Sequence, residues 1–503
     1  MMSMERDVCI IGSGMGGGTL ALELARRGLT PLLIEAGDDQ PGSLSVNHES
    51  AGRPFGLEKS RAIELGGSTN LWHGVVSPLD RRDFSSSLCG QYSGWPLSYE
   101  EMLKYWSQAL GFLGFDQPAL THFDMLQDRS QKLANDIRFD RSRLRPKLFR
   151  VMGKPRRLKH DLREAANAGS IELMTGGTVL ELIRSEDDPG RVDRVIVGLG
   201  DKKVEIRARR FVIAAGALET PRLLLNSRSF GAAGLGNDAG NVGRYLMDHP
   251  MGFLGKIRFR RAVRAALYSD IREKRGNRFR IGLVPTDGAA GANSNLYLRP
   301  AIPGATPQAE NDILISLIAV RNMRELSLKH LRNLIGNPAV LYRIIANRYA
   351  LPLRYRAADL FFVTEQTPYR DSRVSLSTSV DRYGYPIARV SWQVSEQDSR
   401  NIGQFIERIT VEALNDSQYQ FDEFPSSENW SKSFTSAAHH LGTARIASHP
   451  ADGVVDTNLR VHGIRNVWIC DGSVFPTGGN ANPSLTICAL ALRLGEHLME
   501  GAL

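Results

Sequence analysis

Apolar residues in this chain gather in short runs that are separated by polar, glycine-rich stretches. The first run, residues 8–11, has the length of a buried strand. A helical pattern covers residues 20–25, and a second apolar run, residues 31–34, closes the unit. A strand, a glycine-rich turn, a helix and a strand in this order predict the start of a parallel α/β sheet.

Two further apolar runs lie far along the chain, at residues 211–214 and 467–470. A predicted helix follows each run. One opens at residues 221–225, and the other covers residues 483–498 with proline in its first turn. Strands so far from the first unit indicate that one α/β domain is assembled from separated pieces of the chain.

The pattern changes between residues 251 and 434, where short stretches alternate apolar and polar positions. Alternation with turns between the stretches predicts an antiparallel sheet. At 503 residues the chain also exceeds a single ordinary core. We therefore predict an α/β fold, α+β overall, with two domains. The α/β domain would comprise residues 1–95, 160–250 and 435–503, and the second domain residues 96–159 and 251–434.

Residues 326–353 form a predicted helical segment inside the second domain. The sequence Gly-Asn-Pro at residues 336–338 divides it into two helices. A helix packed on the core is the default interpretation. A substrate lid and an amphipathic contact with a membrane surface are the alternatives.

Basic residues outnumber acidic ones, 63 to 54, and the net charge is +9. They are densest at residues 138–163, 256–280 and 321–356. No nucleic-acid motif accompanies them, so no nucleic-acid partner is expected. Solvated faces are the ordinary interpretation, with an anionic substrate or membrane surface as the alternative.

The four cysteines have no disulfide or metal-ligand spacing, so buried reduced thiols and no metal are predicted. No run of about 18 apolar residues suits a membrane-spanning helix. The first strand begins within ten residues of the start, which leaves no room for a signal peptide. These features together predict a cytoplasmic protein.

The turn after the first predicted strand contains Gly12, Gly14 and Gly17 in GxGxxG spacing, and Glu35 ends the second strand. Gly12 permits a tight turn, Gly14 lets the backbone approach a pyrophosphate, and Gly17 lets the helix pack on the strand. Glu35 is placed to accept hydrogen bonds from a ribose, which disfavours NADP. The motif therefore predicts an adenine dinucleotide, and it does not separate FAD from NAD.

Two other turns carry exposed donors. The turn at residues 66–69 is glycine-rich and would contact the same cofactor nearer its reactive ring, although a plain surface turn is equally compatible. Asn480 and Asn482 precede the last predicted helix, where they offer N–H groups to an anion or oxyanion.

Several motifs resemble the glucose–methanol–choline (GMC) oxidoreductases, which bind FAD and oxidise alcohols. The similar segments follow the family's order along nearly the whole chain. They are GSGMGGG with Glu35, LGGSTNLWHG, FVIAAGALETPRLLLNS, NVGRYLMDHP, HHLGTAR and DGSVFPT with NANPSLTICALALR. The block at residues 365–392 and Trp72 resemble the bacterial sugar-oxidising branches.

The resemblance implies catalytic roles for His439, from the HxxGT motif, and for Asn482, from the NPxLT motif. An imidazole can take the hydroxyl proton of the substrate, and an amide can hold the hydroxyl oxygen. The HxxGT spacing selects His439, so His440 is expected to point into packing, and His73, His249 and His462 are interpreted as structural. The implied FAD-binding residues are Gly12, Ser13, Gly14, Gly16, Gly17, Glu35, Ala36, Gly67, Ser68, Asn70, Leu71, Trp72, Val179, Ala215, Gly216, Asp471, Gly472, Asn482 and Pro483.

Members with covalently attached flavin carry a His where this chain has Leu71, so non-covalent FAD is predicted. The predicted reaction oxidises an alcohol, with a sugar or glycoside favoured and a hydrophobic alcohol second. A non-redox FAD-containing lyase and a nicotinamide dehydrogenase remain as alternatives from other classes. The sequence leaves the electron acceptor open among oxygen, a quinone and a partner protein.

Overall fold

The structure is a computed structural model of the 503-residue chain. It describes residues 6–40, 47–52, 56–84, 94–115, 138–264, 271–272, 277–286, 293–301, 312–313, 315–317, 319–320, 327–349, 354–416, 418–423 and 434–500.

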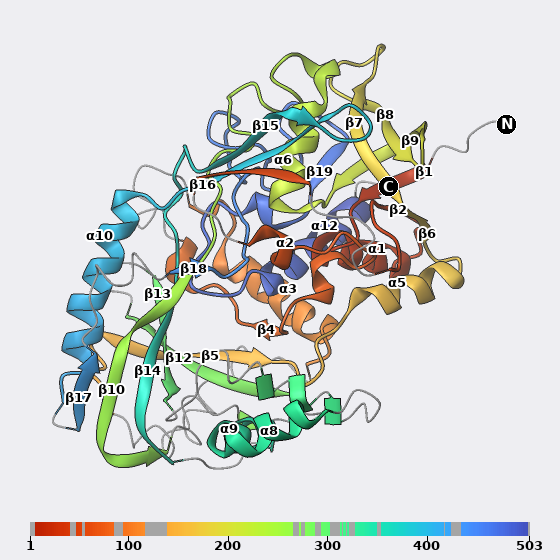
Figure 1. Ribbon diagram of the computed structural model, residues 1–503. Helices are drawn as coiled ribbons and strands as arrows, with labels where there is room; N and C mark the ends of the chain where they lie inside the picture. The colour runs from red at the N-terminus through yellow and green to blue at the C-terminus, as the bar shows by residue number, and fades with distance from the viewer. Residues whose placement is uncertain are drawn as a thin grey trace.

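A mixed sheet at one end of the molecule carries the predicted strands (Figure 1). Its parallel part is formed by β6 (Glu172–Thr175), β2 (Leu32–Glu35), β1 (Arg6–Ile11), β9 (Lys202–Ile213) and β19 (Val467–Ile469). β7 (Gly177–Arg184) and β8 (Val192–Leu199) extend β9 in antiparallel fashion. Pieces of chain more than 200 residues apart thus pair in one sheet, and the predicted fold class is confirmed.

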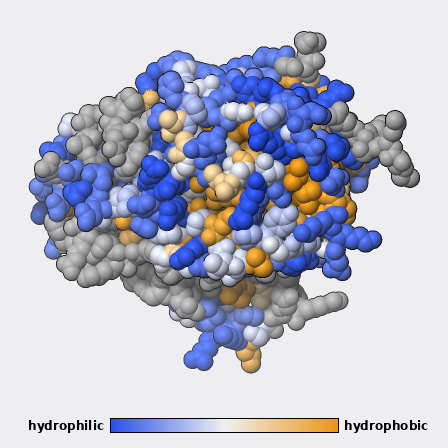
Figure 2. All heavy atoms as spheres, turned by 90° about the horizontal axis from the view of Figure 1, so that it is seen from above, coloured by the Kyte–Doolittle hydropathy of each residue, from blue (hydrophilic) through white to orange (hydrophobic). Residues whose placement is uncertain are grey.

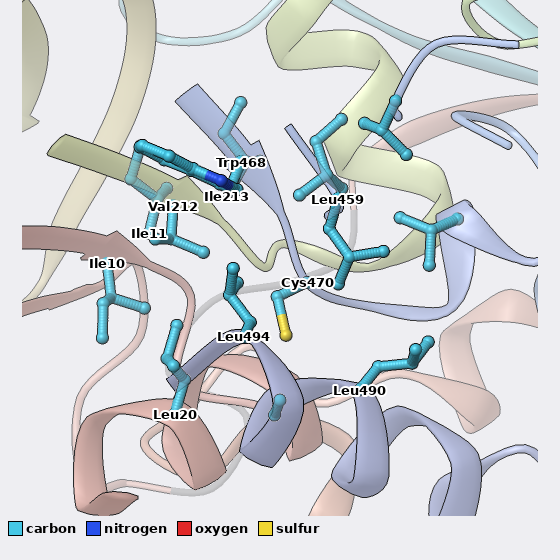
Figure 3. Packing of buried hydrophobic residues seen from close by; sticks show 14 of the residues in the cluster. Ile10, Ile11, Leu20, Val212, Ile213, Leu459, Trp468, Cys470, Leu490 and Leu494 are labelled. Carbon is cyan, nitrogen blue, oxygen red and sulfur yellow. The ribbon is translucent and has the colours of Figure 1, made fainter. Parts of the chain in front are cut away.

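Helices cover this sheet. α1 (Met15–Arg26) packs against α12 (Ser484–Glu500) and α5 (Leu158–Asn167), and α12 packs against α3 (Tyr99–Phe112). Figure 3 shows apolar side chains of the strands facing those of α1 and α12 across the layer. Ile10, Val212, Leu20 and Leu494 are all completely buried there. Strands covered on both faces read as continuous apolar runs, which is why the sequence identifies them well.

α6 (Gly216–Asn226) begins five residues earlier than predicted and contains Pro221 in its interior. A proline there leaves the carbonyl of the residue four positions earlier without its helical donor. The hydroxyl of Thr443 donates to this carbonyl of Ala217 at 2.6 Å. A contact across 226 residues therefore permits a helix that the local sequence argues against.

The predicted antiparallel sheet forms the second large layer, at the other end of the molecule (Figure 1). Its main path runs through β17 (Tyr419–Glu423), β10 (Pro250–Arg264), β14 (Arg354–Thr364), β13 (Ser294–Pro300), β12 (Arg278–Pro285), β5 (Leu144–Val151) and β4 (Val75–Val76). Two short strands, β11 (Ile271–Arg272) and β18 (Thr435–Ser436), pair at its sides. β15 (Arg373–Val380), β16 (Pro386–Trp392) and β3 (His48–Gly52) form a separate small sheet.

The remaining described elements connect these layers. They are α2 (Leu57–Ser60), α10 (Glu396–Gln404), η1 (Gly67–Asn70), η2 (Arg81–Phe84), η4 (Arg228–Phe230), η7 (Phe405–Val411) and η8 (Gly472–Val474). The predicted helical segment 326–353 consists of α8 (Leu328–Gly336) and α9 (Pro338–Tyr349), which meet at the predicted break. Residues 326 and 350–353 lie outside the described residues.

The predicted division into domains remains a prediction. Residues 96–159, which were assigned to the second domain, contribute to both layers of the structure. β5 lies in the large antiparallel sheet, whereas the buried side chains of α3 belong to the core around the parallel sheet. Both elements were assigned to the second domain.

Cys9, Cys470 and Cys488 are buried free thiols, and Cys89 lies outside the described residues. In the part of the chain that is described, no helix is long and apolar enough to cross a bilayer.

Candidate active site

The first glycine turn is shaped by close backbone contacts. Gly12 has φ +100, and a Cβ at Gly17 would lie 2.0 Å from the carbonyl oxygen of Gly12. A Cβ at Gly16 would lie 1.8 Å from the carbonyl oxygen of Cys470. Gly14 differs, because its φ of −64 suits any residue and its added Cβ would meet nothing within 4 Å. The protein itself therefore does not require glycine at position 14, which faces open space.

Glu35 ties this turn to its surroundings. One carboxylate oxygen accepts hydrogen bonds from the N–H of Ser13 at 2.9 Å and from its hydroxyl at 2.6 Å, and the other accepts from Gly37 N–H. The hydroxyl oxygen of Ser13 accepts from the N–H of Gly66 at 2.8 Å, which joins the two predicted glycine turns. Burial raises the pKa of Glu35, and these hydrogen bonds act against that rise. Glu35 thus fixes the turn from the position predicted for ribose contact.

One cavity of about 1310 Å³ runs from this turn to His439 and Asn482. This volume exceeds that of ordinary single-ligand pockets and is large enough for a dinucleotide beside a substrate. Nearly all the predicted site residues line it. These are Gly12, Ser13, Gly14, Gly16, Glu35, Ala36, Gly67, Ser68, Leu71, Trp72, Val179, Ala215, Gly216, His439, Asp471, Gly472, Asn482 and Pro483.

Two predicted residues do not line the cavity. Gly17 packs against the backbone of Gly12, as its role in helix–strand packing demands. The side-chain amide of Asn70 donates to the carbonyl of Leu65 at 2.9 Å and so holds the second glycine turn.

Asp471 joins two loops at the cavity wall. Its Oδ2 accepts from Gly216 N–H at 2.8 Å and from the Thr220 hydroxyl at 2.6 Å, and its Oδ1 accepts from Ser473 N–H. Burial raises the pKa of this carboxyl group, opposed by the same hydrogen bonds. The first turn of α6 is therefore fixed where a cofactor would pass.

His439 lies between two polar side chains. Its Nε2 is 3.1 Å from the amide nitrogen of Asn482, and its Nδ1 is 2.8 Å from Nδ1 of His249. The two imidazole rings are nearly perpendicular, at 83°. The structure thus brings together the two residues predicted as catalytic and adds His249, which was interpreted as structural.

The hydrogen-bond partners define the tautomers of this pair. Nε2 of His249 lies 2.9 Å from the carbonyl oxygen of Gly479, which can only accept, so this nitrogen carries the proton. Burial lowers the pKa of His249 to about 4, so the ring is neutral and its Nδ1 has a free lone pair. Nδ1–H of His439 then donates to that lone pair. Nε2 of His439 is left unprotonated, facing Asn482.

Asp248 holds the backbone that carries His439. This buried carboxylate accepts from the N–H groups of Ala437, His249 and His439 and from the hydroxyl of Ser436. Burial raises its pKa to about 6. The loop needs this support because Ala438 has φ +62, a conformation that costs about 1 kcal/mol for a residue other than glycine.

His440 also lines the cavity, with its Nε2 3.7 Å from a carboxylate oxygen of Asp248. Burial lowers its pKa to about 3. Asn482 and His249 are both hydrogen-bonded to His439. His439, rather than His440, is therefore the residue that links them.

Asn480 lines the cavity, and its side chain is hydrogen-bonded within the protein. Its oxygen accepts from Lys147 at 2.7 Å and its amide group donates to Asn293 at 2.7 Å. Asn293 in turn donates to Asp83, whose pKa is raised to about 8 by burial and by nearby carboxylates. This buried polar cluster holds the loop that carries Gly479, the acceptor for His249.

Two family models match parts of the chain. Residues 7–233 match a family model described as FAD dependent oxidoreductase, and residues 368–491 match one described as GMC oxidoreductase. A 2-methyl-1,2-propanediol dehydrogenase of Mycolicibacterium austroafricanum is 24% identical, covering 98% of this chain and 95% of the relative. A paromamine 6'-oxidase of Streptomyces fradiae is 25% identical over 97% of this chain and 90% of the relative.

The fold is also that of a solved structure. The crystal structure of pyridoxine 4-oxidase from Mesorbium loti covers 99% of both chains with a TM-score of 0.61 and 17% identity.

Gly14 provides a direct test of where FAD binds. We expect Gly14→Val to fold normally, since the backbone conformation suits valine and an added Cβ would meet no protein atom within 4 Å. The added side chain would fill cofactor space and weaken FAD binding at least ~10-fold. Flavin content after purification and FAD titration of the stripped protein measure this, with Gly14→Ala as a smaller graded change. Full flavin occupancy in Gly14→Val would place the pyrophosphate elsewhere.

Proposed function

The chain belongs to the GMC oxidoreductase family and is an FAD-dependent enzyme that acts on CH–OH groups, and from this premise we propose that His439 is its general base. FAD, when bound, supplies the acceptor for the hydride of the carbinol carbon. The unprotonated Nε2 of His439 accepts the hydroxyl proton of the substrate. The observation that carries this proposal is the hydrogen-bonded chain Gly479–His249–His439–Asn482.

Asn482 would orient the substrate. Its amide nitrogen is hydrogen-bonded to Nε2 of His439 at 3.1 Å, so a substrate hydroxyl oxygen that takes the place of this bond can contact both groups. An amide cannot take the proton, but it can donate to the alkoxide that develops as the proton leaves. His439 and Asn482 thus divide the work between proton removal and oxygen binding.

His249 would act as a positioning residue. Its Nδ1 accepts the Nδ1–H of His439 and thereby keeps the Nε2 lone pair directed at the substrate. Without that acceptor, the other tautomer of His439 would place a proton on Nε2 and block proton transfer.

We propose a sugar or glycoside as the favoured substrate class. Asn295, Tyr297 and Arg299 alternate along β13 and line the cavity, so one face of the large sheet offers several hydrogen-bonding groups. The block at residues 365–392 also resembles the sugar-oxidising branches. A hydrophobic alcohol is the second candidate, because Met251, Phe253, Phe361 and Val363 line the same face.

Non-covalent binding of FAD is also proposed. Leu71 occupies the position where covalent members of the family have His, and it lines the cavity. Denaturation in acid should release all the flavin from the polypeptide. His73 also lines the cavity, and flavin that stays bound after denaturation would point to it.

Replacing His439 tests the base. We expect His439→Gln to retain FAD and to lower the rate of anaerobic flavin reduction by about 10²-fold or more. Burial lowers the pKa of His439 well below 6.5, so the wild-type rate should stay constant through neutral pH and fall only at lower pH, where the ring is protonated. His440→Gln is the neighbouring comparison. A large loss there, with His439→Gln still active, would assign the base to His440.

Replacing His249 tests the tautomer. His249→Leu removes the acceptor for Nδ1–H, and we expect turnover to fall about 10- to 100-fold with a smaller change in KM. His249 also lowers the pKa of His439, so the acidic limb of the pH–rate profile should move to higher pH. His249→Asn places an oxygen near the lost Nδ1 and should restore much of the rate. A purely structural role would leave the pH profile unchanged in His249→Leu and would give no rescue.

A further inference from the structure

Large apolar side chains are exposed unevenly over the described part of the chain. Seven of the eleven exposed there lie between residues 315 and 345. They are Ile315, Val320, Leu328, Leu331, Ile335, Tyr342 and Ile345. Scattered apolar residues are ordinary on protein surfaces, but a contiguous group marks an interaction site.

α8 carries the most exposed members on one face. Leu328, Leu331 and Ile335 are 85%, 40% and 79% exposed and follow the i, i+3, i+7 spacing of a single helical face. On α9, Tyr342 and Ile345 are 54% and 39% exposed and also share a face, while Val340 is buried and anchors this helix. We call these five exposed residues the apolar stripe.

The charged residues in the sequence of α8 and α9 have one sign. Residues 327–349 include Lys329, Arg332, Arg343 and Arg348 and contain neither aspartate nor glutamate. Lys329 and Arg332 are exposed on α8, next to the stripe in sequence. Short amphipathic helices with apolar and cationic residues bind in the interface of anionic membranes.

We propose that the apolar stripe of α8 and α9 binds the surface of an anionic lipid bilayer. Leucine and isoleucine would enter the boundary between headgroups and acyl chains, Tyr342 would lie at headgroup level, and Lys329 and Arg332 would contact lipid phosphates. A bilayer accommodates protruding aliphatic side chains without a matching pocket. Protein interfaces are instead enriched in aromatic residues and depleted of lysine, which fits this surface less well.

The position of α8 and α9 suits such a contact. They lie at the end of the molecule formed by the antiparallel sheet, away from the parallel sheet (Figure 1). The opposite face, in Figure 2, is largely hydrophilic, with apolar residues gathered near its middle and on its right side. Contact through α8 and α9 would therefore leave the parallel sheet and its glycine turns directed away from the lipid.

Vesicle binding by the full-length holoenzyme tests this proposal. We expect cosedimentation with phosphatidylcholine vesicles that contain about 30 mol% phosphatidylglycerol, weakened by salt, and at least ~10-fold weaker binding to phosphatidylcholine alone. Leu328→Gln with Ile335→Gln should weaken binding at least ~10-fold. Lys329→Gln with Arg332→Gln should weaken it ~10-fold on anionic vesicles and leave binding to neutral ones unchanged.

The matched control is Leu199→Gln with Val380→Gln, which removes exposed apolar residues from β8 and β15 and should bind like wild type. All three double variants should keep the wild-type rate on a dissolved alcohol. Absence of vesicle binding, or equal binding by the Leu328/Ile335 variant, would overturn the proposal. So would a lipid-free oligomer that this variant dissociates, since the stripe would then contact a second copy of the chain.

Discussion

The candidate active site depends on close approaches between backbone segments at one edge of the parallel sheet. β1, β9 and β19 lie side by side and are parallel, so the turns after them meet at the same edge. The carbonyl oxygen of Ala214 would lie 2.5 Å from a Cβ at Gly12, and that of Cys470 would lie 1.8 Å from one at Gly16. Side chains at these glycines would push the three turns apart. These close approaches shape the wall of the cavity at this edge of the sheet.

Buried carboxylates also hold the loops of the site in place. Glu35, Asp471, Asp248 and Glu365 each accept at least one backbone N–H from a loop of the site. An ionised carboxylate makes stronger hydrogen bonds than a neutral acceptor, which compensates for part of its desolvation. The acidic residues therefore act first as supports of the loops. Glu35 and Asp471 also line the cavity, so support and cofactor contact are compatible roles for the same side chain.

The sequence predicted features that are encoded locally and missed those that depend on distant partners. Strands β1 and β19 appear as apolar runs because both of their faces are buried, and the glycine spacing reflects contacts within one turn. The predicted start of α6 was wrong because Thr443, whose hydroxyl donates a hydrogen bond to the carbonyl of Ala217, is remote in sequence. His249 was interpreted as structural because its contact with His439 spans 190 residues. The sequence did contain one signal for His249, because it follows Asp248 in the NVGRYLMDHP segment that resembles the family.

The proposed catalytic residues and the proposed substrate-facing residues lie in different layers of the molecule. His439 and Asn482 are carried by loops held by buried carboxylates and by the polar cluster around Asn480, where small changes would disturb several hydrogen bonds at once. The cavity residues of the large antiparallel sheet come from alternate positions along its strands. Their side chains can change while the strand pairing stays intact. The proposed catalytic pair is therefore tightly constrained, whereas the sheet face is free to vary. This difference explains why the chemistry follows from the sequence more readily than the identity of the alcohol.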